Sequence, residues 1–81
     1  MMETAREMFN KLGYTRKLDS EKLIYTKILK YTFNYCFEIT FDLLKKEVEF
    51  FDDFEDYTIN NALLKAIYKQ AKELGWLSVT L

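Results

Sequence analysis

The sequence contains no histidine, only two glycines and a single cysteine among its 81 residues. Histidine is the commonest general base near neutral pH and the commonest metal ligand, so most acid–base and metalloenzyme chemistry is not expected. Gly13 and Gly75 are far apart, so no glycine-rich loop can hold a nucleotide phosphate. The two serines and the cysteine do not lie in any recognised nucleophile motif. We therefore expect a protein that is not an enzyme and has no catalytic residue, metal or cofactor.

The sequence also gives no indication of disulfides or membrane spans. Cys36 has no second cysteine to pair with, whereas secreted domains of this size usually depend on several disulfides. No apolar run approaches the length of about 18 residues that crosses a bilayer. Residues 1–10 alternate charged and apolar side chains and do not resemble a signal peptide. These features predict a cytoplasmic protein.

The chain is short but has the composition of a folded protein. Hydrophobic residues make up 49% and charged residues 31%, unlike a disordered sequence. Aromatic residues reach 17%, and bulky rings bury much area in a small core. At this length there is room for one core, so we expect residues 1–81 to form a single domain.

Two segments have the pattern of capped helices. Thr4 and Glu7 have the spacing of a capping box, in which each side chain satisfies a free backbone N–H group of the other residue. An apolar stripe and then Gly13 follow, which predicts a helix over residues 5–12. Thr58 is the expected N-cap of a longer second helix that ends at Gly75, with Trp76 contacting that end. Residues 76–81 are predicted to form a short strand or a frayed tail.

Between these helices the apolar residues recur at every second position, which is typical of half-buried strands. The alternation is clearest over residues 35–43, and residues 23–29 and 47–52 flank it with short connections. We therefore predict an α+β fold with the order α-β-β-β-α. Its three-stranded antiparallel sheet would pack with both helices on its apolar face.

The charges are unevenly distributed along the chain. Residues 47–60 carry a net charge of −6, whereas residues 1–30 carry +3, and the whole chain carries −1. Three interpretations of the acidic stretch compete. The carboxylates could stabilise the start of the second helix and protect an edge strand, they could bind a cation, or they could bind a basic protein surface. A calcium loop would need a different spacing of oxygen ligands and a central glycine.

Our main hypothesis from the sequence is that a partner protein binds the acidic stretch. The predicted binding residues are Glu49, Asp52, Asp53, Glu55 and Asp56. Carboxylates on a strand and loop can occupy positions that nucleic-acid phosphates would otherwise take on a basic surface.

Two alternatives remain open. In the first, the chain binds nucleic acid through Tyr25, Tyr35 and Phe37 on the sheet and through the lysines of the second helix, which are Lys65, Lys69 and Lys72. In the second, it forms a homo-oligomer through spare aromatic surface and the strand at residues 77–81.

Four segments carry a resemblance to a group of known proteins. They are Met8-Phe9-Asn10-Lys11-Leu12-Gly13-Tyr14, Ile24-Tyr25-Thr26-Lys27, Ile39-Thr40-Phe41-Asp42 and the run from Ala66 to Trp76. The chain resembles the short uncharacterised proteins of phages and mobile elements in low-GC Gram-positive bacteria. The resemblance implies an accessory protein that binds a host protein in the host cytoplasm. Inhibition of a nuclease of the CRISPR or restriction type, through an acidic surface, is the form of this activity that we expect.

Overall fold

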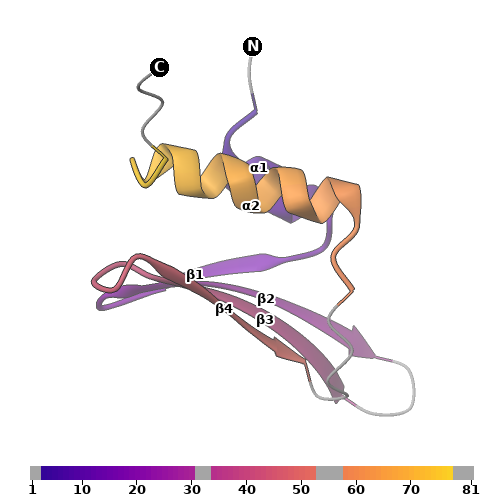
Figure 1. Cartoon of the computed structure of the whole chain (residues 1–81). Helices are drawn as coiled ribbons and strands as arrows, with labels where there is room; N and C mark the ends of the chain where they lie inside the picture. The colour runs from indigo at the N-terminus through magenta and orange to yellow at the C-terminus, as the bar shows by residue number, and fades with distance from the viewer. Residues whose placement is uncertain (1–2, 31–33, 53–57, 78–81) are drawn as a thin grey trace.

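The computed structural model describes residues 3–30, 34–52 and 58–77 of the chain. In chain order these residues form α1 (Ala5–Lys11), β1 (Thr15–Asp19), β2 (Lys22–Lys30), β3 (Asn34–Asp42), β4 (Glu47–Asp52) and α2 (Asn61–Glu73). Both helices lie on the same face of one antiparallel sheet (Figure 1). The predicted α+β class is confirmed.

The capping signals of α1 act as the sequence predicts. The Thr4 hydroxyl accepts a hydrogen bond from the Glu7 backbone N–H at 3.2 Å, and Glu7 Oε1 accepts one from the Thr4 N–H at 2.9 Å. At the other end the Tyr14 N–H donates to the Phe9 carbonyl at 3.0 Å. This closure needs a left-handed residue between them, which Gly13 supplies with a φ of 93°.

The start of α2 differs from the prediction. Its N-cap is Asn60, not Thr58, because Asn60 Oδ1 accepts a hydrogen bond from the Leu63 N–H at 2.8 Å. Both residue types are good N-caps, and an asparagine two residues downstream competes well with a threonine. Ile59 therefore precedes the helix and is 40% exposed. The predicted end is confirmed, since Gly75 has a φ of 77° and the Trp76 N–H donates to the Ala71 carbonyl at 3.0 Å.

The sheet has four strands in the order β1-β2-β3-β4, so the predicted three-stranded sheet is wrong by one strand. The missed strand is β1, all of whose residues are exposed. A strand with no buried side chain leaves no alternation of apolar and polar residues in the sequence. Its turn to β2 also lacks a glycine or asparagine, because Ser20 takes the left-handed conformation with a φ of 55°.

The turn between β3 and β4 is held by the side chain of Asp42. Its Oδ1 accepts hydrogen bonds from the backbone N–H groups of Leu44 at 3.1 Å and Lys45 at 3.0 Å. The bond from Lys45 is the main reason why the pKa of Asp42 lies below its ordinary value. These bonds fix the register of β4, in which Phe50 lies opposite Ile39 and Asp52 opposite Phe37.

The core lies between the helices and the sheet face that they cover, which we call the inner face. Phe9 of α1 stacks on Tyr25 of β2, with ring centroids 3.8 Å apart, and Phe41 of β3 meets both rings edge-on. The Tyr25 hydroxyl donates a hydrogen bond of 2.5 Å to Gln70 of α2, which is itself buried. Both helices are therefore tied to the same aromatic cluster.

A second contact links the two helices to each other. The backbone N–H of Ala5, at the start of α1, donates to Glu73 Oε2, at the end of α2, over 2.7 Å. The carboxylate satisfies one of the free N–H groups at that helix start and complements its positive end. The helices therefore run in opposite directions.

Candidate functional site

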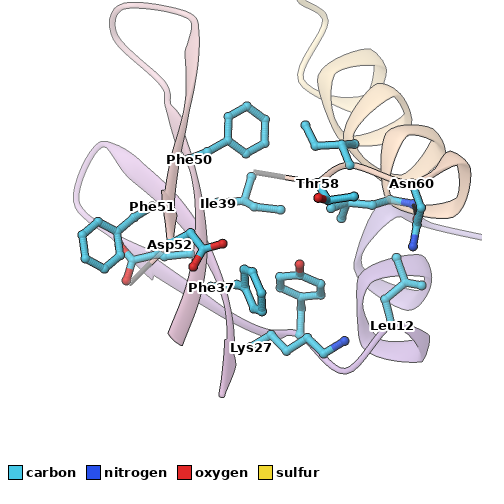
Figure 2. A pocket seen from close by; sticks show the side chains of 13 residues that line it. Leu12, Lys27, Phe37, Ile39, Phe50, Phe51, Asp52, Thr58 and Asn60 are labelled. Atoms are coloured by element: carbon cyan, nitrogen blue, oxygen red, sulfur yellow. Dashed lines mark hydrogen bonds between the residues drawn. The ribbon is translucent and has the colours of Figure 1, made fainter. Parts of the chain in front are cut away.

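A cavity of about 160 Å³ opens between the inner face of the sheet and the segment that leads into α2 (Figure 2). The residues around it come from the connection between α1 and β1, from β2, β3 and β4, and from residues 58–63 at the start of α2. They are Leu12, Tyr14, Lys27, Phe37, Glu38, Ile39, Phe50, Phe51, Asp52, Thr58, Ile59, Asn60 and Leu63.

Strand alternation decides which side chains face this cavity. Phe37 and Ile39 on β3 and their cross-strand partners Asp52 and Phe50 on β4 share the inner face. Figure 2 shows Phe50 beside the cavity and Phe51 pointing away on the other side of β4. The edge of the core under β4 is thus built from two aromatic rings, an isoleucine and a carboxylate.

Asp52 is the least expected member of this group, because it is a carboxylate with only 3% of its surface exposed. It is the last residue of β4, and Figure 2 shows its side chain among Phe37, Ile39 and Phe50. A carboxylate that is removed from bulk water interacts more strongly with charges and dipoles nearby. It is therefore the group that dominates the chemistry of this cavity.

Tyr14 and Lys27 complete the polar part of the wall. Burial raises the pKa of the Tyr14 hydroxyl, and the negative charge of Asp52 raises it further. Lys27 Nζ lies 5.8 Å from the centre of the Tyr14 ring, within range of a cation–π interaction. Tyr14 thus already contacts one cation, on the side of the cavity formed by β2.

Of the predicted acidic residues, the structure describes Glu49 and Asp52 and places them on opposite faces of the sheet. Glu49 is exposed and lies on the opposite side of β4 from Asp52, which is buried in the cavity wall. Asp53, Glu55 and Asp56 lie outside the described residues. The expectation that Asp52 shares an exposed acidic surface with Glu49 is therefore corrected. The alternation of Val48, Phe50 and Asp52 was the sequence signal that Asp52 faces inward.

Of the aromatic residues predicted to stack on bases, Tyr25 and Phe37 lie on the inner face of the sheet. Tyr25 is fully buried beneath Phe9, and Phe37 is half-buried in the cavity wall. The side chain of Tyr35 is not among those that the structure describes. On α2, Lys65 and Lys72 are exposed and Lys69 is half-buried, so nucleic-acid binding by these lysines stays a prediction.

The part of the chain that the structure describes holds no group of three or more cysteine, aspartate or glutamate residues placed to bind a metal ion. Neither α1 nor α2 is long and apolar enough to cross a membrane. Aromatic, aliphatic and carboxylate side chains around a cavity of this kind can bind a ligand.

Comparison of the chain with protein-family models, with curated proteins and with solved structures finds no match. The resemblance to short phage and mobile-element proteins therefore stays a prediction, and the function is argued from the cavity itself.

Proposed function

We propose that this chain is a non-catalytic binding protein whose cavity beside β4 receives a lysine or arginine side chain from a basic segment of a partner protein. The observation that carries the proposal is the position of Asp52, a carboxylate that is 3% exposed in the wall of an open cavity beside two phenylalanine rings.

The chemistry of the cavity wall suits such a side chain. The faces of aromatic rings attract cations, and a partly desolvated carboxylate forms a strong charge-assisted hydrogen bond. The aliphatic stem of a lysine or arginine would pack against Ile39 and Phe37 while its charged end meets Asp52.

The size of the cavity favours a single side chain over a cofactor. Its volume of about 160 Å³ is below the range of roughly 300–1,000 Å³ that is usual for small-molecule sites. One inserted side chain from a protein surface is the typical anchor of a protein–protein interface.

The class of partner follows from the charges. A protein that binds nucleic-acid phosphates carries exposed lysine and arginine side chains, and an acidic protein can bind to these in place of the phosphates. We propose a host protein of this class as the partner, with a nuclease as the form implied by the resemblance. The binding would take place in the reducing cytoplasm, where Cys36 stays a thiol.

A peptide titration tests the cavity directly. A short peptide with one central lysine is added to the ¹⁵N-labelled protein, and a second peptide carries norleucine, which has a similar apolar stem and no charge. We expect the lysine peptide to give saturable shifts at the amides of Phe37, Phe50 and Asp52. The norleucine peptide should give much weaker shifts, because it lacks the cation.

The variant Asp52→Asn keeps the size of the side chain and removes its charge. It should weaken binding of the lysine peptide about tenfold or more, as expected when a charge-assisted hydrogen bond is lost. The matched control Glu21→Gln removes an exposed carboxylate from the β1–β2 turn and should leave the affinity unchanged. Equal binding of both peptides, or an unchanged affinity of Asp52→Asn, would contradict the proposal.

A further inference from the structure

The face of the sheet opposite the helices, which we call the outer face, is not covered by either described helix (Figure 1). It carries exposed apolar side chains among polar ones, since Ile28 and Phe51 are each 55% exposed. Ile24, Thr26 and Cys36 are half-buried on the same face, between the two edge strands. An uncovered face of this composition is suited to contact with another protein surface.

Along one row of this face the charge changes sign from one edge strand to the other. Strand register aligns Lys17 of β1 with Ile24, Ile24 with Thr40, and Thr40 with Glu49 of β4. This row therefore begins with a cation at one edge and ends with a carboxylate at the other. Lys17 and Glu49 are both exposed.

We infer that the outer face binds the outer face of a second copy of this chain, with β1 of each protomer over β4 of its partner. A two-fold axis that runs along the strands, between β2 and β3, produces this arrangement. It places Lys17 of each protomer opposite Glu49 of the other, so the same favourable pair forms twice. A two-fold axis across the strands would instead place β4 over its own copy, where Glu47 and Glu49 would face only carboxylates or Phe51.

The neighbouring rows are compatible with this pairing. Lys22 faces Asp42 of the second copy, and Ile28 faces Cys36 of the second copy. One pair is unfavourable, because Asp19 faces Glu47 at the corner of the sheet. Aligned sheets cross at about 30°, so corner residues diverge while the central rows stay in contact. The inferred dimer leaves the cavity on the inner face open, so it is independent of the proposed ligand.

Charge reversal tests the pairing through the association state, measured by sedimentation equilibrium over a dilution series. The wild type should dimerise, and Lys17→Glu and Glu49→Lys should each weaken the homodimer at least about tenfold, because each places two pairs of like charges face to face. An equimolar mixture of the two variants should dimerise again. In the mixed dimer both pairs are of opposite sign. Lys65→Glu, which reverses an exposed charge on α2, should behave like the wild type.

Recovery in the mixture distinguishes this pairing from a general effect of charge or folding, and circular dichroism of each variant confirms that it is folded. A wild type that stays monomeric at millimolar concentration would overturn the inference. The inference would also be overturned if either single variant dimerised as tightly as the wild type. It would be overturned, too, if the mixture dimerised no more tightly than each variant alone.

Discussion

The two faces of the sheet are made from the same strands, yet their apolar side chains differ in how far they are buried. On the inner face Leu23, Tyr25 and Phe41 are at most 2% exposed beneath the helices. On the outer face Ile28 and Phe51, which are also large and apolar, are each 55% exposed. Hydrophobic side chains therefore do not by themselves distinguish core from surface in this chain. The helices make that distinction by covering only one face.

The largest effect that we expect from this comparison comes from a pair of phenylalanines. Phe9→Ala removes a fully buried ring that stacks on Tyr25, and should lower the free energy of unfolding by about 3–5 kcal/mol. Phe51→Ala should change it by less than about 0.5 kcal/mol in the monomer, because that ring is already exposed. Urea denaturation followed by Trp76 fluorescence at low protein concentration measures both. Similar losses for the two variants would mean that the outer face is buried as well.

This difference between the faces also explains how far the sequence could predict the structure. The alternation of apolar and polar residues identified the strands that have one buried face. Thr4 and Glu7 located the start of α1, and Gly13 and Gly75 located the ends of α1 and α2, because local hydrogen bonds at helix ends require such residues. Strand β1 was missed because it is paired through its backbone and buries no side chain. The cavity was missed because Leu12, Phe50 and Asn60 are brought together only by tertiary packing.

The second prediction concerns the one polar contact inside the aromatic core. Tyr25→Phe keeps the ring and removes the hydroxyl that donates to Gln70, which is 4% exposed. The amide oxygen of Gln70 would then be buried without its donor, at a cost of about 1–3 kcal/mol in the free energy of unfolding. Tyr68→Phe is the matched control, since Tyr68 is 55% exposed on α2 and should tolerate the change. Equal urea midpoints for the two variants would show that the Gln70 bond adds nothing to stability.

The third and smallest effect lies at the turn between β3 and β4. The folded-state pKa of Asp42 is below its ordinary value of 3.8, chiefly because the Lys45 N–H donates to it. Ionised Asp42 therefore stabilises the fold at pH values above about 4, and this stabilisation is lost as the pH falls through the lowered pKa. Asp42→Asn keeps an oxygen that can accept the same bonds and removes the charge. The stability difference between wild type and variant should shrink between about pH 5 and pH 2. A difference that does not vary with pH would contradict this assignment.

The hydrogen bond between Ala5 and Glu73 joins residues that are 68 positions apart, and this separation has a consequence for synthesis. Chains emerge from the ribosome with the N-terminus first, so strands β1 to β4 can pair locally before α2 exists. Helix α1 has 7 residues and is too short to be stable alone. Until α2 is made, a nascent chain carries a paired sheet whose aromatic face is only partly covered. Translation that stops before residue 73 would release a product with this face exposed, which chaperones and proteases recognise.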